Sequence, residues 1–199
     1  MRTLRGARVL VTGGYGFVGL HVCRFLSVLS TEFRVVDSLA RASVNKDAVR
    51  GLPGFVGAVH AAVETESAWS LAAQFPRPDL VIHLAAESHV DASIASPVLS
   101  MESNAVGTVR AAEYAVRTGA VLAYCSTDEV YGDAADVPVP PDGMDEDAPL
   151  RPSSPYSAGK AAGEHAISAF ARTYGLRAVV TRGSNAFGPN QHGEKLVPV

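Results

Sequence analysis

The alternation of short apolar runs with longer segments of helical periodicity restricts the fold of this chain more than any other feature. Runs rich in Val, Ile and Leu predict six strands, at Ala7–Thr12, Phe33–Asp37, Phe55–Val59, Asp79–Leu84, Ala120–Ser126 and Leu176–Arg182. The segments between them predict helices at Phe17–Leu29, Glu64–Phe75, Val98–Arg117 and Pro155–Tyr174, with a further short one at Val44–Arg50. Strands that alternate with helices build βαβ units, so the sequence predicts an α/β fold with a doubly wound parallel sheet.

Composition and charge exclude several classes of protein. The chain has 199 residues, of which 47% are hydrophobic and 19% charged, as in an ordinary globular protein. The net charge is -3, and basic residues cluster only at Arg2, Arg5 and Arg8, which argues against a nucleic-acid partner. No segment approaches the roughly 18 apolar residues of a membrane span, and no signal-peptide core opens the chain. We therefore expect a cytoplasmic protein with no membrane partner.

A glycine-rich turn follows the first predicted strand. It contains overlapping G-x-G-x-x-G and G-x-x-G-x-x-G patterns, built from Gly13, Gly14, Gly16 and Gly19. Each pattern is weak alone, but here a strand precedes it, a helix follows at Phe17, and the second strand ends at Asp37, where a carboxylate would bind the ribose of a dinucleotide. The context predicts a Rossmann-type site, with the pyrophosphate at the helix N-terminus. The Asp37 carboxylate would repel a ribose 2′-phosphate, which favours NAD over NADP. Arg41 keeps NADP as an open alternative.

Polar residues also follow the fifth predicted strand. Thr127, Asp128 and Glu129 come directly after the buried run, and the carboxyl ends of parallel strands form the crevice in which α/β sheets bind ligands. These side chains are therefore candidates for chemistry. The alternative interpretation is a capped turn with two solvated acids, which is the commoner fate of Asp and Glu after a strand.

A Tyr-x-x-x-Lys pattern opens the last predicted helix. Tyr156 and Lys160 lie one turn apart on the same helix face. A lysine ammonium and a cationic nicotinamide beside a tyrosine would stabilise the phenolate, so that the tyrosine serves as a base at neutral pH. The same pattern is frequent in purely structural helices, so its significance depends on the other motifs. The two cysteines, Cys23 and Cys125, lack metal-ligand spacing, and no metal site is predicted.

Together these motifs resemble the extended short-chain dehydrogenase/reductases, and within that superfamily most closely the dTDP-glucose 4,6-dehydratases. The matching segments are Gly13–Gly19, His83–Asp91, Ser126–Gly132, Pro152–Ser157, Thr181–Asn185 and Glu194–Leu196. The glycine turn and the tyrosine segment are shared across the superfamily, whereas Thr127–Glu129 and Glu87–Asp91 are specific to sugar-nucleotide 4,6-dehydratases. The resemblance implies a lyase of deoxysugar biosynthesis that uses NAD and a nucleotide sugar, with dTDP-glucose favoured.

The resemblance also implies roles for individual residues. Tyr156 would take the proton of the sugar 4-hydroxyl while hydride passes to NAD, Glu129 would remove the carbon 5 proton, and Asp128 would protonate the departing 6-hydroxyl. Thr127 would hydrogen-bond the 4-oxygen, and Lys160 would tune Tyr156. The implied cofactor-binding residues are Gly13, Gly16, Phe17, Val18, Gly19, Asp37, Ser38, Leu39, Ala62, Val63, Leu84, Ala85, Ala86, Glu87, Ser103, Tyr156 and Lys160. The implied substrate-binding residues are Ser88, His89, Thr127, Asn185, Lys195 and Leu196.

The chain departs from the family pattern in length and at a few positions. Ala62 and Val63 stand where the family has an acidic residue followed by Ile or Val, and Ala186 replaces an asparagine. We expect an NAD-binding domain at residues 1–182 and only the start of a substrate-binding lobe at 183–199, with most of that lobe absent. A homodimer formed through Val98–Arg117 and Pro155–Tyr174 is expected from the resemblance. The alternatives are a 4,6-dehydratase or 4-epimerase of another nucleotide sugar, and a non-catalytic NAD-binding module.

Overall fold

The protein folds around one parallel six-stranded sheet. The computed structural model describes residues 4–40, 45–133, 135–136 and 139–191. The strands are β1 (Arg8–Thr12), β2 (Glu32–Asp37), β3 (Phe55–His60), β4 (Leu80–His83), β5 (Val121–Thr127) and β6 (Ala178–Gly183). Their spatial order is β3-β2-β1-β4-β5-β6, and every pairing is parallel. The predicted doubly wound sheet is confirmed, and each strand lies within two residues of its predicted bounds.

The helices of the described residues follow the predicted alternation, with three segments that were not predicted. The α-helices are α1 (Phe17–Val28), α2 (Lys46–Arg50), α3 (Glu66–Ala72), α4 (Val90–Ala95), α5 (Pro97–Met101), α6 (Gly107–Thr118) and α7 (Pro155–Tyr174). Helix α7 has the predicted bounds, because Ser154 caps it through a capping box with Ser157 and Gly175 ends it in the left-handed conformation. Helix α4, a 3-10 turn η3 (Asp128–Tyr131) and a π-helical segment η2 (Glu102–Val106) were not predicted. The expected helix start at Val44 lies outside the described residues.

The continuous helix predicted at Val98–Arg117 is wrong in its middle. The segment is built of α5, the π-helical η2 and α6, so the α-helical hydrogen-bond pattern is interrupted between Glu102 and Val106. At this point the Thr108 hydroxyl donates to the Asn104 carbonyl at 2.6 Å, and the Asn104 side chain bonds the backbone of Glu87. Such wide turns frequently mark functional sites.

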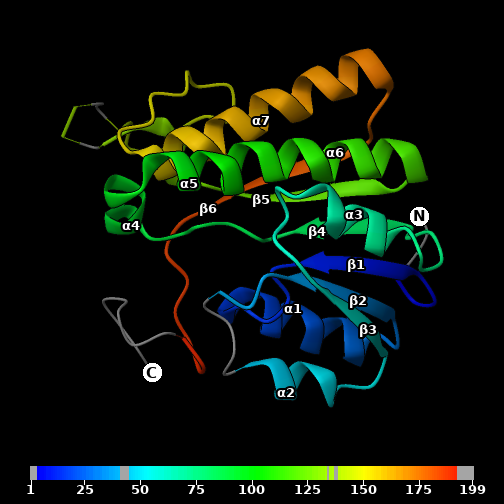
Figure 1. Cartoon of the computed structure of the whole chain (residues 1–199). Helices are drawn as coiled ribbons and strands as arrows, with labels where there is room; N and C mark the ends of the chain where they lie inside the picture. The colour runs from blue at the N-terminus through cyan, green and yellow to red at the C-terminus, as the bar shows by residue number, and fades with distance from the viewer. Residues whose placement is uncertain (1–3, 41–44, 134, 137–138, 192–199) are drawn as a thin grey trace.

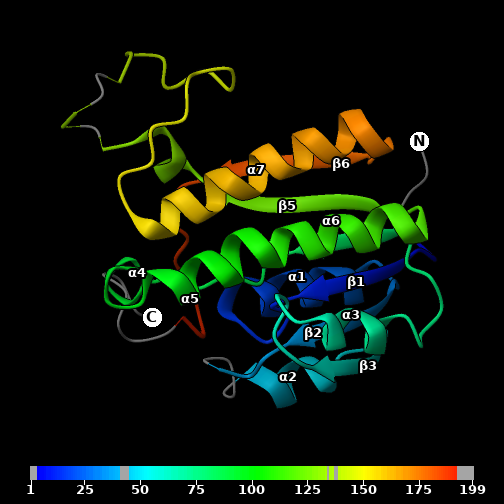
Figure 2. The same ribbon diagram turned by 45° about the horizontal axis from the view of Figure 1, so that its top comes forward.

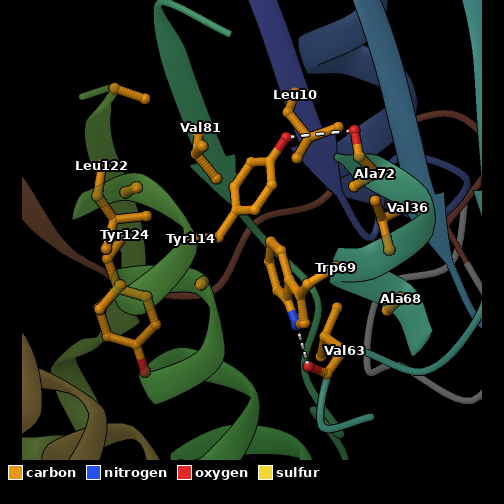
Figure 3. Packing of buried hydrophobic residues seen from close by; sticks show 14 of the residues in the cluster. Leu10, Val36, Val63, Ala68, Trp69, Ala72, Val81, Tyr114, Leu122 and Tyr124 are labelled. Atoms are coloured by element: carbon orange, nitrogen blue, oxygen red, sulfur yellow. Dashed lines mark hydrogen bonds between the residues drawn. The ribbon is translucent and has the colours of Figure 1, made fainter. Parts of the chain in front are cut away.

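Helices cover the sheet on both faces, and each face has its own core. Helices α1 and α2 lie on one face, and α3, α6 and α7 lie on the other (Figures 1 and 2). Trp69 belongs to the core under α3, α6 and α7, where its ring centroid lies 5.2 Å from that of Tyr114 (Figure 3). Their polar atoms are satisfied locally, since Trp69 Nε1 donates to the Val63 carbonyl and the Tyr114 hydroxyl to the Ala72 carbonyl.

This topology brings the carboxyl ends of three strands to one edge of the sheet. The order of the strands reverses between β1 and β4, where Thr12 pairs with His83, and β5 lies beside β4. Ligands of doubly wound sheets bind at such a switch point. The glycine turn, the segment after β4 and the polar segment after β5 therefore meet at the edge where α4 and the start of α7 lie (Figure 1). None of the helices in the described ranges is long and apolar enough to span a membrane.

Candidate active site

The turn between β1 and α1 is shaped by glycines that admit no side chain. Gly13 has a φ of +68°, and a Cβ placed on it would lie 2.7 Å from the backbone nitrogen of Ala85. A Cβ on Gly14 would lie 2.6 Å from a methyl group of Val35. The turn therefore packs directly on β2 and on the segment after β4, and α1 begins beside it at Phe17. Bare backbone next to a helix N-terminus fits a pyrophosphate group.

Asp37 ends β2 beside this turn, and its binding of a ribose stays a prediction. One carboxylate oxygen accepts from the Tyr15 amide at 3.0 Å and the other from the Leu39 amide at 2.8 Å. Burial raises the pKa of Asp37, and the two amide hydrogen bonds oppose that shift. Ser38 and Leu39 follow directly, with Leu39 in the left-handed region at a φ of +63°. The geometry thus holds the carboxylate rigidly at the end of the strand.

A buried histidine links β1 to β4 and α6. His83 lies between two hydroxyls, with its Nδ1 2.7 Å from Thr12 Oγ1 and its Nε2 3.3 Å from Thr108 Oγ1. Complete burial lowers the pKa of His83 to about 3, so the ring is neutral at physiological pH. Thr12 Oγ1 also accepts from the amides of Leu84 and Ala85, each at 3.2 Å. His83 therefore orders the segment that follows β4 and is a packed, hydrogen-bonded histidine.

The segment Leu84–His89 is held from its other side by Asn104. The Asn104 side chain accepts from the Glu87 amide at 2.9 Å and donates to the Glu87 carbonyl at 3.0 Å. Helix α7 packs closely over this contact, since a Cβ on Gly159 would lie 2.8 Å from the Cβ of Asn104. His89 occupies the N-terminal cap position of α4, and its amide donates to a carboxylate oxygen of Glu87. The segment is thus fixed by both of its neighbours.

The acids after β5 lie near the tyrosine of α7. Thr127 caps η3, accepting from the Glu129 amide at 3.3 Å, and its hydroxyl donates to Asp128 at 3.4 Å. Besides burial, the charges of Glu129 and Asp128 act on Tyr156 and raise its pKa, and Thr127 lies close enough to Tyr156 to lower that pKa. The four side chains therefore form one cluster that combines a phenol, a hydroxyl and two carboxylates.

Tyr156 and Lys160 are buried on one face of α7, and burial shifts the pKa of each away from its charged form. Burial and the nearby Glu129 raise the pKa of Tyr156 to about 12, with the nearby Thr127 opposing the shift. Burial lowers the pKa of Lys160 to about 8. The Lys160 amine donates to the Cys125 carbonyl at 2.6 Å and lies 4.6 Å from the centre of the Tyr124 ring. In the protein alone Tyr156 is therefore protonated at neutral pH, and its tuning by Lys160 stays a prediction.

Two charged residues of the site were not predicted. Glu164 lies one turn beyond Lys160 on the same face of α7 and is 8% exposed, and its carboxylate pairs with Arg182 of β6 at 2.6 Å. The four-residue steps from Tyr156 to Lys160 to Glu164 are the signal that would have placed Glu164 on the catalytic face. Arg182 could not be predicted as the partner of Glu164, because their pairing depends on how α7 packs against β6 and no local sequence pattern indicates that packing.

An open cavity of about 820 Å³ lies beside the cluster. It is lined by Asp128, Glu129, Tyr131, Met144, Arg182 and Asn185, among others. The predicted substrate residue Asn185 therefore shares the cavity with both acids. The predicted substrate residues Lys195 and Leu196, like Arg41, lie outside the described residues. Among the predicted cofactor residues, Val63 has its side chain in the core beside Trp69.

Comparison with known proteins shows the family to which the chain belongs. Residues 9–198 match the model of the NAD dependent epimerase/dehydratase family. The chain belongs to this family. A dTDP-glucose 4,6-dehydratase from Haemophilus influenzae is 38% identical to it, over 96% of this chain and 59% of the relative's length. The chain thus spans less than two thirds of the curated relatives it matches.

Solved structures of the family have the same fold. The crystal structure of dTDP-glucose 4,6-dehydratase from Streptomyces venezuelae with NAD bound is 40% identical, with a TM-score of 0.84, over 96% of this chain and 60% of that chain. UDP-glucose 4-epimerase from Thermus thermophilus in complex with NAD is 35% identical, with a TM-score of 0.79, over 94% of this chain and 58% of that chain. The predicted family resemblance and fold are confirmed, and NAD is confirmed as the cofactor of the family.

Proposed function

We propose that the protein uses NAD to dehydrate dTDP-glucose to dTDP-4-keto-6-deoxyglucose. The observation that carries this proposal is the cluster of Thr127, Asp128, Glu129 and Tyr156 beside the cavity. Oxidation at carbon 4 requires one base, whereas loss of water across carbons 5 and 6 requires a further base and an acid. The cluster supplies all three kinds of group, and relatives at 37–39% identity carry the name of this reaction.

The residues that would hold the cofactor line the switch point of the sheet. The glycine turn and the start of α1 would receive the pyrophosphate, and Asp37 a ribose. On the other side of the turn, the segment Leu84–Glu87 would lie along the cofactor, with Ser103 close to it on η2 and Lys160 at the nicotinamide ribose. Bound NAD would supply the hydride acceptor and a positive charge near Tyr156.

The protein's own residues would divide the proton transfers among them. Tyr156 would accept the proton of the 4-hydroxyl once its pKa falls from about 12, and the Thr127 hydroxyl would hold the 4-oxygen. Glu129 would remove the proton of carbon 5, which a 4-keto group makes acidic. Asp128 would give its proton to the 6-hydroxyl, which leaves as water. Ser88 and His89, where α4 begins, would border the sugar, and Asn185 would contact it across the cavity.

A second candidate is 4-epimerisation of a nucleotide sugar. Three solved 4-epimerases, at 31–35% identity and with TM-scores of 0.79–0.84, support it, because their fold matches this chain about as well as that of the dehydratase does. Epimerisation needs the tyrosine base and a mobile 4-keto sugar, but it uses no elimination acid or base. Two carboxylates beside Tyr156 therefore support dehydration.

The test is to incubate the protein with NAD and dTDP-glucose and to identify the product by NMR. A 4-keto-6-deoxy sugar is expected, and the variants Asp128→Asn and Glu129→Gln are expected to slow its formation by about 100-fold or more, as loss of a general acid or base does. Glu113→Gln on the exposed face of α6 serves as the control. A product inverted at carbon 4 with its 6-hydroxyl intact would contradict the proposal.

The organisation of the chain and its assembly are proposed on the same basis. Residues 1–182 would form the NAD-binding domain, since β6 ends at Gly183 and residues 184–191 contain no helix or strand. Residues 183–199 would begin the substrate-binding lobe. The protein would form a homodimer through the segments Val98–Arg117 and Pro155–Tyr174, and would work in the cytoplasm.

A further inference from the structure

A largely buried ion pair joins α7 to β6 beside the candidate catalytic acids, and its Arg182 side chain lines the same cavity. Arg182 donates from Nε and Nη2 to Glu164 Oε2, at 3.0 and 2.6 Å, and the side chains are 19% and 7% exposed. These hydrogen bonds raise the pKa of the Arg182 guanidinium, which stays charged. Charge-assisted bonds of this kind are strong, and the planar guanidinium fixes their direction.

The pair also contacts both ends of the segment that carries the acids. At the first end, Ser126 Oγ donates to Glu164 Oε1 at 2.5 Å. At the other end, Arg182 Nη1 donates to the Tyr131 hydroxyl at 2.7 Å, and the guanidinium carbon lies 4.9 Å from the centre of the Tyr131 ring. Thr127, Asp128 and Glu129 lie between these two anchored residues. One ion pair therefore limits the movement of the whole segment.

The same pair relates the acids to the tyrosine and to the cavity. Glu164 lies two helical turns from Tyr156 on one face of α7, so the contact with Ser126 sets the distance between helix and acids. Arg182 Nη1 also donates to the Glu146 carbonyl at 2.7 Å, and Glu146 lines the cavity. The ion pair therefore connects α7, which carries Tyr156, with the segment that carries the acids and with one wall of the cavity.

We propose that Glu164 and Arg182 are positioning residues that hold Asp128 and Glu129 in register with Tyr156 for the loss of water. This inference rests on the proposed function. In that step the carbon 5 hydrogen leaves as a proton to Glu129, and its electron pair forms the carbon 5–carbon 6 double bond. The carbon 6–oxygen bond breaks, and Asp128 supplies the proton that completes the water. A displacement of the acids by about 1 Å would slow this step by about 100-fold, whereas Tyr156, the base for oxidation at carbon 4, lies outside this segment on α7.

Single-turnover kinetics with NAD and dTDP-glucose separate the two steps. The absorbance of reduced nicotinamide measures the rate of the first step. We expect Glu164→Gln and Arg182→Lys to form reduced nicotinamide at a rate within about threefold of the wild type. The later loss of water is expected to slow by about 10- to 100-fold, so that reduced nicotinamide accumulates. The control is Glu113→Gln, which removes an exposed ion pair with Arg110 and should change neither step.

Two smaller variants keep the test valid if the charged variants unfold. Tyr131→Phe and Ser126→Ala each remove one hydrogen bond to the pair, and each is expected to accelerate amide hydrogen exchange at Asp128–Val130 in the ligand-free protein and to slow water loss. Unchanged exchange and unchanged water loss in both variants would overturn the inference, as would an equal decline of both chemical steps. Absence of dehydration by the wild type would refute the proposed function instead, and exchange would still measure the anchoring.

Discussion

At the scale of single residues, the two buried tyrosine hydroxyls of Tyr15 and Tyr114 differ in whether they are satisfied. The Tyr114 hydroxyl donates to the Ala72 carbonyl at 3.3 Å. The Tyr15 hydroxyl is buried in the other core and has no hydrogen-bond partner among the described residues. Burying a polar group without a partner costs roughly 1–3 kcal/mol, whereas a satisfied hydrogen bond contributes about 1 kcal/mol.

The variant Tyr15→Phe should therefore leave the free energy of unfolding unchanged or increase it, by up to roughly 1–3 kcal/mol. The matched control Tyr114→Phe should lower it by about 0.5–1.5 kcal/mol, because it removes a formed hydrogen bond. Urea denaturation measures both. A loss of stability in Tyr15→Phe as large as that in the control would show that the hydroxyl is satisfied.

His83 makes stability depend on pH in a predictable direction. Burial lowers its pKa from 6.5 to about 3 in the folded protein, so between these values the unfolded chain binds a proton that the folded protein does not. The contribution of neutral His83 is fully present above pH 6.5 and falls with decreasing pH, by about 1.4 kcal/mol per unit. The difference in unfolding free energy between the wild type and His83→Gln should therefore shrink from pH 6.5 downward. A constant difference, measured by urea denaturation across this range, would contradict the assignment.

At the scale of elements, α7 and the π-helical η2 pack without room for a further methyl group. A Cβ on Gly159 would lie 2.8 Å from the Cβ of Asn104, whose side chain holds Glu87. Gly159→Ala is therefore expected to destabilise the protein by about 1–3 kcal/mol and to weaken NAD binding through the displaced Leu84–Glu87 segment. Calorimetric unfolding and NAD titration measure the two effects.

The control for this prediction is Gly51→Ala at the end of α2. Gly51 has a φ of -79°, and its added Cβ would meet no atom closer than 3.5 Å. This substitution should be neutral or slightly stabilising. Equal stability of the two variants would mean that the helices separate freely at Gly159.

Element boundaries were predictable where the chain carries local signals. Ser154, Pro155 and Gly175 mark the ends of α7, and its predicted bounds were correct. The π-helical η2 has no such signal, because the apolar period of the predicted helix continues through it. The wide turn of η2 accompanies the hydrogen bonds between Asn104 and Glu87. These residues are 17 positions apart in the sequence, so no local pattern indicates their contact.

At the scale of the whole molecule, several exposed apolar side chains lie on α4, α5 and η2. Ile94, Val98 and Leu99 are each more than 60% exposed, and Val98 borders a shallow hollow that is also lined by Met101 and Val106. Contiguous apolar surface of this kind is typical of an interface. We expect Val98→Glu to convert a dimer into monomers in sedimentation velocity, and Val28→Glu, at an 82% exposed position on α1, to leave the mass unchanged. A wild-type monomer, or a dimer in both variants, would contradict the proposed interface.

The site was predictable in part because of the parallel topology. Residues that directly follow β1, β2, β4 and β5 reach one edge of the sheet whatever the details of packing, which is why Gly13, Asp37 and Asp128 could be placed together. The pairing of Glu164 with Arg182 could not be predicted, since it depends on the position of α7 against β6. The raised pKa of Tyr156 is likewise a result of tertiary burial, which no local motif encodes.

Oxidation and dehydration of one and the same sugar molecule can be followed with dTDP-glucose that carries deuterium at carbon 4. We expect a 4-keto-6-deoxy product with the deuterium at carbon 6 of the same molecule, because the hydride removed from carbon 4 returns there. Mass spectrometry and NMR locate the label. Deuterium retained at carbon 4 of a sugar with inverted configuration and an intact 6-hydroxyl would contradict this expectation.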